Sequence, residues 1–244
     1  MITLEKLYDL ELETKATFLT FLSNSKWWRP EAFTLFSNRH REYFTCSINW
    51  SDEKPQINND NIFDLLGCYK SQDSHWEEEG RIIMYPNAIW EYAEKLIKSQ
   101  GKNVPVEELF NKLTRIILIH ELSHWVFHWL PCDSIHGEIQ RNKFYKSFNT
   151  ELHEFVAQYF TWTAITENTS FKLLGLQDIF LEMCKDQSSV YRLYENAKGI
   201  DYEVVFFATA NIRHEKFTFK DYEWLLNDPI NSKDKILAKD LGLI

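Results

Sequence analysis

Residues 106–130 read VEELFNKLTRIILIHELSHWVFHWL, and this stretch decides the fold of the 244-residue chain. It contains no glycine or proline, and its apolar residues recur at the spacing of a helix face, so it predicts one long helix. Pro105 suits a first helical position and Pro131 closes the segment, with two glutamates in the predicted first turn. The apolar positions that define the face are Leu109, Leu113, Ile116, Ile117 and Phe127.

Within this helix, residues 120–124 read His-Glu-Leu-Ser-His. His120 and His124 are four positions apart, so their imidazoles lie on one helix face and can share a metal ion. Glu121 projects from the adjacent position, where it can hold a water without being a ligand. This is the H-E-x-x-H arrangement of zinc peptidases, in which the carboxylate is the general base. A surface helix with two unrelated histidines is the alternative, but unpaired imidazoles are costly to bury in an apolar run.

A site of this kind needs a third protein ligand, and residues 150–160, TELHEFVAQYF, predict its source. They follow a loop-like region and read as a second helix, with Asn149 or Thr150 as its N-cap. Glu154 shares a helix face with Ala157, and a small residue lets two helices approach closely. We therefore expect Glu154 to be the third ligand. The alternative ligands are Glu151, His153, Asp133 and Cys132.

The pattern His120-Glu121-x-x-His124 followed by Glu154-x-x-Ala157 resembles the gluzincins, zinc peptidases whose third ligand is a glutamate on a second helix. His128 extends the first motif by one helix turn. The run from His120 to His128 is similar to that of small intracellular gluzincins of the ImmA/IrrE type, which are associated with cleavage of transcriptional repressors. The resemblance covers about residues 81–162. It implies a Zn²⁺ cofactor held by both histidines and the glutamate of the second helix.

Other positions in the sequence refine this resemblance. Gln158 stands where the gluzincin motif usually has Asp or Asn, so its support of the ligands is open. Metzincins need Gly and a third His at positions that Phe127 and Leu130 occupy here. Deformylases need an upstream Glu-Gly-Cys segment, and Leu-Gly-Cys at residues 66–68 departs from it. His128 lies one further turn along the helix, and a lone His on an apolar helix favours a structural role.

The order of the predicted elements indicates an α+β, helix-rich fold. By the resemblance, its core is zincin-like, with a small sheet that has an edge strand, a backing helix, an active-site helix and a glutamate helix. We divide the chain into an N-terminal mixed region (1–75), a zincin-like catalytic core (76–167) and a helical C-terminal region (168–244). These regions are expected to form one compact unit.

Local patterns predict the remaining elements. We expect a helix over residues 4–22, strand-like sequence over 42–50 and polar turns over 51–61. Residues 81–86 predict a short strand, and Asn87 can cap a helix that runs to about residue 99. The C-terminal region predicts four helices, over residues 176–185, 190–196, 202–213 and 220–226.

Composition excludes several classes of protein. The net charge is −9 and there is no dense Lys/Arg tract, which argues against nucleic-acid binding. With seven glycines and no glycine-rich phosphate loop, a nucleotide cofactor is not expected. No apolar run is long enough to span a membrane, and the amino terminus lacks the features of a secretory signal. Four scattered cysteines without a C-x-x-C pair predict reduced thiols and a cytoplasmic location.

We therefore expect a cytoplasmic zinc metalloprotease that hydrolyses a protein or peptide substrate, with Glu121 as its catalytic base and with no membrane or nucleic-acid partner. The alternatives are a regulatory binding protein that retains a zincin fold and a metal-dependent amidohydrolase that acts on a non-peptide substrate. The carboxylate beside both histidines favours an enzyme, because a structural site needs no base. Such a site also needs a donor to the oxyanion. The unranked candidates for this donor are Tyr159, His153, Tyr191, Tyr202 and His214.

Overall fold

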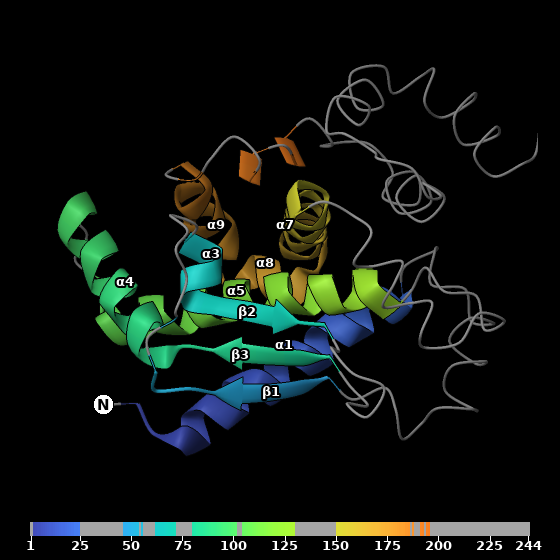
Figure 1. The fold of residues 1–244 in the computed structure, drawn as a ribbon. Coiled ribbons are helices and arrows are strands. Elements are labelled where there is room, and N and C mark those ends of the chain that lie inside the picture. The colour runs from blue at the N-terminus through green and yellow to red at the C-terminus, as the bar shows by residue number, and fades with distance from the viewer. Residues whose placement is uncertain are drawn as a thin grey trace, which may run out of the picture.

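A computed structural model describes most of the N-terminal and central parts of the chain (Figure 1). Several sequence predictions lie outside the described residues. They are the candidate residues Cys132, Asp133, Asn149, Tyr202 and His214 and the helices predicted over 202–213 and 220–226. The described residues are 2–24, 46–53, 55, 62–71, 80–101, 104–129, 150–185, 187, 191–192 and 194–195.

Three short strands form one mixed sheet in the order β1-β3-β2. β3 (Arg81–Met84) is the central strand, parallel to β1 (Ser47–Trp50) and antiparallel to β2 (Gly67–Lys70). Ile82 and Met84 on β3 are buried and alternate with more exposed residues, as the two-residue period of a strand requires. The strand predicted at residues 81–86 is thus confirmed over its first four residues, at the centre of the sheet and not at its edge.

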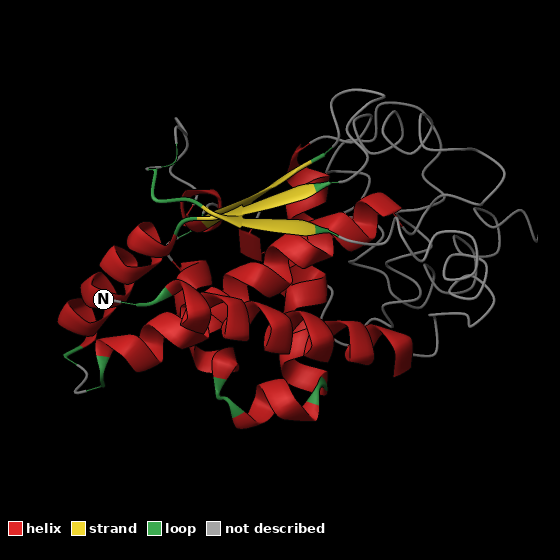
Figure 2. Ribbon diagram, turned by 90° about the horizontal axis from the view of Figure 1, so that it is seen from below, coloured by secondary structure: helices red, strands yellow, loops and turns green. Residues whose placement is uncertain are grey.

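Helices make up most of the described structure, and the long ones pack along one side of the sheet (Figure 2). α5 (Val106–Trp129) is central, since it contacts α1, α4, α7, α9 and both β2 and β3. Residues 113–128 of α5 are all buried, so this part of the helix is enclosed on every side. The other helices are α1 (Leu4–Asn24), α3 (Ile62–Leu66), α4 (Pro86–Gln100), α7 (Thr150–Glu167), α8 (Thr169–Leu173) and α9 (Leu176–Lys185).

The sequence-based helix limits hold with two corrections. Asn87 does not cap α4, because Pro86 takes the first helical position and Tyr85 precedes it without a side-chain cap. Proline is pre-organised for that position, since its ring fixes φ and no amide hydrogen is lost. Of the α-helix predicted over 190–196, the structure describes residues 191–192 and 194–195, and these form 3₁₀ turns instead. The helix predicted over 176–185 is confirmed as α9.

One hydrophobic core draws on all three regions of the chain. It runs from Leu7 on α1 through the sheet and α5 to Tyr194. The sequence did not predict two elements, α3 and β2. β2 packs on α5, α3 packs on β2 and α4, and Phe63 and Leu66 of α3 belong to this core. The fold is α+β and helix-rich, as expected. Among the described residues, no helix is both long and apolar enough to cross a bilayer.

Candidate metal centre

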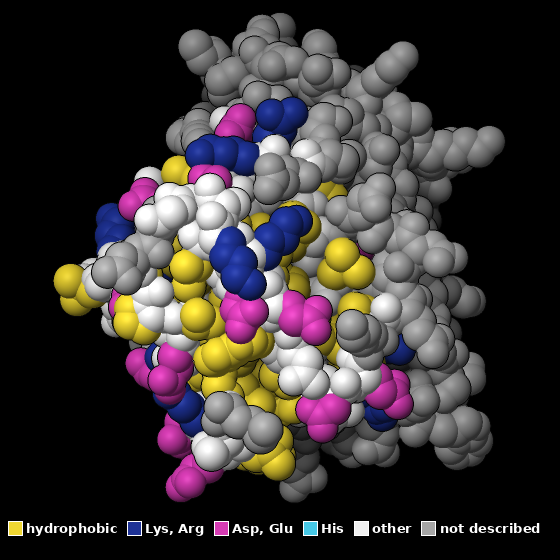
Figure 3. Space-filling view, turned by 90° about the vertical axis from the view of Figure 1, so that its left-hand side faces the viewer, with side chains coloured by type: hydrophobic (Ala, Val, Ile, Leu, Met, Phe, Trp, Pro, Cys, Tyr) yellow, Lys and Arg dark blue, Asp and Glu magenta, His cyan; other side chains and the backbone are white. Residues whose placement is uncertain are grey.

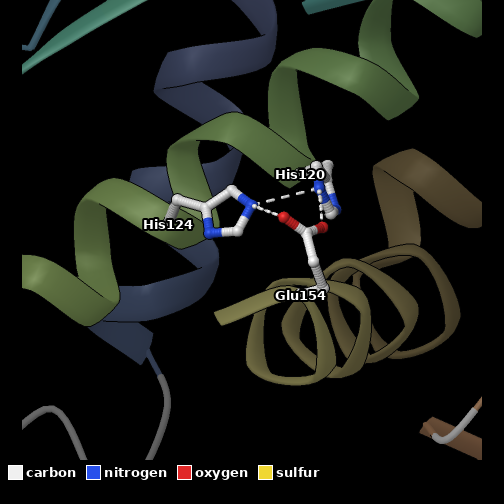
Figure 4. A group of neighbouring side chains, drawn as sticks. All are labelled: His120, His124 and Glu154. Atoms are coloured by element: carbon white, nitrogen blue, oxygen red, sulfur yellow. Dashed lines mark hydrogen bonds and ion pairs between the residues drawn. The ribbon is translucent and has the colours of Figure 1, made fainter. Parts of the chain in front are cut away.

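His120 and His124 on α5 and Glu154 on α7 point toward one another (Figure 4). The two histidine Nε2 atoms lie 3.2 Å apart. His120 Nε2 is 3.3 Å from Glu154 Oε2, and His124 Nε2 is 3.5 Å from Glu154 Oε1. The structure therefore brings the three sequence-predicted ligands to one point between two helices.

The three distances between these ligand atoms fit a tetrahedral zinc site. Zinc–nitrogen and zinc–oxygen bonds of about 2.0–2.1 Å in a tetrahedron separate neighbouring ligand atoms by about 3.3 Å. The three separations in this structure, 3.2, 3.3 and 3.5 Å, agree with that value. Two imidazole nitrogens this close repel each other through their lone pairs unless a proton or a cation lies between them. The residues present thus suit a bound divalent cation.

The site is buried within the core. His120, His124 and Glu154 have exposed fractions of 0 %, 5 % and 6 %. The Nδ1 atoms of both histidines have no hydrogen-bond partner within the part of the chain that the structure describes. Phe63 packs against the His120 ring with centroids 4.6 Å apart, and this apolar contact excludes water from that side.

The packing of α5 against α7 positions the ligands. Ala157 is fully buried on α7, which agrees with its expected role as the small residue that allows close approach. Ser123 on α5 and Thr161 on α7 are also buried, and each hydroxyl donates to the carbonyl four residues earlier at 2.7 Å. These hydroxyl groups are therefore satisfied within their own helices.

The charge distribution of the metal-free site places one proton among the three ligands. Burial lowers the pKa of His120 to about 4. Burial alone also lowers the pKa of His124, but the carboxylates of Glu154 and Glu121 outweigh it and raise this pKa to about 9. For Glu154, the two imidazoles overcome the effect of burial and hold its pKa well below the ordinary range. A protonated His124 paired with an ionised Glu154 thus occupies the position that suits a metal ion.

Glu121 lies beside this group without being part of it. Its carboxylate accepts a hydrogen bond from the backbone N–H of Tyr69 on β2, and burial raises its pKa to about 8. Its Oε1 atom has no hydrogen-bond partner among the described residues. Gly67 makes room for this side chain, because a Cβ added there would lie 3.3 Å from Glu121 Cγ and 2.6 Å from Ile117 Cγ2.

Sequence reasoning missed three residues near the site: Gly67, Tyr69 and Asp64. Asp64 is half-buried on α3, and its negative charge raises the pKa of both Glu121 and His124. No local pattern marked it, because α3 has only five residues and approaches α5 through tertiary packing. Cys68 on β2 is half-buried as well, and burial raises the pKa of its thiol, which therefore stays protonated.

The other sequence candidates have different surroundings. His153 is half-buried, with its ring centroid 5.6 Å from that of Phe127. Gln158 is buried and accepts a hydrogen bond from the Cys184 thiol at 3.8 Å. Glu151 begins α7, but its side chain lies outside the described part of the structure.

Of the oxyanion candidates, Tyr159 and Tyr191 lie within the described residues. Tyr159 is buried and stacks on Phe155 with ring centroids 6.4 Å apart. Tyr191 stacks on Phe63, whose ring contacts His120, so it is connected to the site through one aromatic ring. Tyr202 and His214 lie outside the described residues.

A cavity of about 520 Å³ lies between α3 and α4 and not at the histidine pair. Its lining combines apolar groups such as Leu65 and Ala88 with the charged Glu91 and Lys95. The face that α4 presents shows hydrophobic side chains between acidic and basic ones (Figure 3). The chemistry of the site is therefore separate from this surface hollow.

Comparisons with protein-family models, with curated proteins and with solved structures found no match to this chain. The functional argument therefore depends on the geometry and chemistry of the site itself.

Proposed function

We propose that this protein is a zinc-dependent metallopeptidase in which His120, His124 and Glu154 hold the metal and Glu121 is the general base. The observation that carries the proposal is the group of three buried candidate ligands, two histidines and one glutamate, with the carboxylate of Glu121 beside it. A purely structural zinc site uses four protein ligands and needs no neighbouring base. Three ligands and a base are the composition of a catalytic site.

When bound, zinc supplies a Lewis acid that polarises a carbonyl group and lowers the pKa of a water molecule. Glu121 takes the proton of the attacking water and delivers it to the leaving amine. Its Oε1 atom suits this role, since it makes no hydrogen bond among the described residues. Burial raises the pKa of Glu121, which makes its carboxylate a stronger proton acceptor.

The arrangement of elements supports a zincin-like core. A small sheet, a backing helix α4, the metal helix α5 and the glutamate helix α7 occur in the order that the gluzincin resemblance implies. His124 and Glu154 are the least buried ligands, so we place the entry of the substrate on their side. Among the described residues, Cys46, Cys68 and Cys184 form no disulfide, which agrees with the proposed cytoplasmic location.

Metal analysis and a peptide library test this function together. We expect the purified protein to carry about one zinc ion and to cleave members of a proteome-derived peptide library, with the new termini read by mass spectrometry. Glu121→Gln should keep its zinc and lose about 10²- to 10⁴-fold in turnover, the usual contribution of a general base. Glu108→Gln is the matched control, because this exposed residue lies on the same helix and pairs with Lys112 at the surface.

Each alternative gives a different result in this experiment. Hydrolysis of small N-acyl amides without peptide cleavage would indicate an amidohydrolase. A zinc-loaded protein with no turnover on either set would indicate a binding protein. Equal turnover of Glu121→Gln and the unmodified protein would refute the assigned base.

A further inference from the structure

Tyr69 joins the edge strand β2 to α5 through its side chain. Its phenol oxygen lies 2.6 Å from His128 Nδ1, and the two rings meet edge to face with centroids 5.9 Å apart. His128 is almost fully buried, so this hydrogen bond is shielded from water. The third histidine of the H-E-x-x-H-x-x-x-H run therefore has a specific partner.

The backbone of the same residue makes a second connection to α5. The Tyr69 N–H donates to the carboxylate of Glu121. Glu121 and His128 are seven residues apart, two helix turns along one face, or about 10.5 Å. One residue of β2 thus contacts α5 at two points on the face that carries the proposed base.

Close packing holds Tyr69 in this place. A side chain at Gly80 would collide with the Tyr69 ring, at 2.6 Å from its Cζ atom, so the ring lies directly on the backbone there. At the start of β2, Gly67 lies equally close to Ile117. Both glycines let β2 and the Tyr69 ring approach their neighbours more closely than larger residues would allow.

We propose that the Tyr69–His128 pair is a positioning device for Glu121. The pair holds β2 against α5, and the Tyr69 N–H then fixes one oxygen of the Glu121 carboxylate. The other oxygen, Oε1, is then left to accept the proton in the proposed reaction. The catalytic meaning of this inference rests on the proposed function, and its geometry rests on the contacts of Tyr69 with His128 and Glu121.

Without the pair, β2 is a four-residue strand bonded to the sheet on one side only within the described structure. Short edge elements open locally more easily than the centre of a core. Once the N–H at position 69 moves, the carboxylate loses this directional contact and samples other rotamers. Because base catalysis depends on placement within a fraction of an ångström, we expect turnover to fall by about 10- to 100-fold.

Two variants and a rescue test this inference. Tyr69→Phe and His128→Leu each remove the hydrogen bond, whereas His128→Asn keeps a polar atom near the Nδ1 position. Tyr8→Phe is the matched control, because it removes a phenol from an exposed residue of α1. Glu121→Ala defines the exchange rate of the residue-69 amide when its acceptor is absent.

The first measurement is hydrogen–deuterium exchange of the backbone amide at residue 69. We expect exchange to speed up by about tenfold in Tyr69→Phe and His128→Leu, towards the rate of Glu121→Ala, and to recover in His128→Asn. Tyr8→Phe should exchange like the unmodified protein. Unchanged protection in Tyr69→Phe would overturn the inference whether or not the protein is an enzyme.

The second measurement separates positioning from general destabilisation. In the zinc-loaded protein, Tyr69→Phe should lower kcat by about 10- to 100-fold, with KM and zinc content unchanged and with partial recovery in His128→Asn. A change confined to KM, or equal losses in His128→Asn and His128→Leu, would refute a positioning role. An unmodified protein that carries zinc and shows no turnover refutes the proposed function instead, and amide exchange then decides alone whether the pair orders Glu121.

Discussion

At the scale of single residues, Glu154 connects the two helices electrostatically. It lies within 3.5 Å of both histidine Nε2 atoms, and it keeps a negative charge because the imidazoles hold its pKa low. Removing that charge leaves a buried imidazolium without a partner. The same carboxylate therefore stabilises the metal-free site and suits the metal-bound one.

Glu154→Gln is expected to weaken zinc binding by more than about 100-fold. Even residues that only support a ligand contribute about 10- to 100-fold to metal affinity, and this variant removes a ligand charge. Competition with a zinc chelator of known affinity measures the change. Glu151→Gln is the control, and it should bind zinc normally. Loss of zinc in Glu151→Gln with retention in Glu154→Gln would make Glu151 the third ligand.

Zinc binding should release protons and strengthen as pH rises. In the metal-free site the pKa of His124 is raised to about 9, so this residue is protonated at pH 7 and must lose its proton to become a ligand. The apparent affinity is therefore expected to increase from pH 6 towards pH 9 and to level off above. Calorimetry in buffers of different ionisation enthalpy should show release of at least about one proton at pH 7. A pH-independent affinity between 6 and 8 would contradict the charge state described here.

At the scale of elements, the contact between β2 and α5 depends on the absence of a side chain at Gly67. The nearest atoms to a Cβ there belong to Ile117, Met84 and Glu121. The elements β2, α5 and β3 thus meet at Gly67. A change at this position acts on the base without altering any ligand.

Gly67→Ala is expected to destabilise the fold by about 1–3 kcal/mol, the usual cost of overpacking, and to reduce turnover while zinc stays bound. Urea unfolding and metal analysis measure the two effects. Gly175→Ala is the contrast, since its φ of 64° is unfavourable for alanine but open space surrounds it. It should lose stability and keep turnover. Full activity in Gly67→Ala would show that β2 and α5 separate without consequence for Glu121.

At the scale of the whole molecule, a metal at this site cross-links two long helices. The ligands on α5 and α7 are about thirty residues apart in sequence, and both helices belong to the single hydrophobic core. An ion that binds only the folded chain stabilises it by mass action. Metal content and global stability should therefore change together.

Removal of zinc should lower the melting temperature by roughly 10 °C. At free zinc about 1,000 times Kd, binding contributes about 4 kcal/mol, and each kcal/mol shifts a domain of this size by about 2–4 °C. Calorimetry with and without a chelator measures the shift. His120→Ala should show none, since it lacks a ligand. An equal shift of the melting temperature in this variant would mean that the zinc ion binds at another site.

Several features were determined by local sequence alone. The unbroken apolar period over residues 106–129 specifies α5, and the four-residue spacing of its histidines places both rings on one face. Glu154, which the sequence predicts as a ligand from Ala157 one turn away, lies beside both histidines, and its role as a ligand stays a prediction. These predictions succeed because helix periodicity is a short-range property that a single segment carries.

Only the tertiary structure decided the surroundings of Glu121, the proposed base. Gly67, Tyr69 and Asp64 belong to a strand of four residues and a helix of five, which are too short to show a period. Their contacts with Glu121 and His128 join positions more than fifty residues apart, and such pairings follow from the packing of the whole core. Local sequence therefore specified the helix that carries the candidate ligands, because the periodicity of its side chains is a property of one segment. Packing of the whole chain selected the residues that enclose these ligands, because burial depends on many segments together.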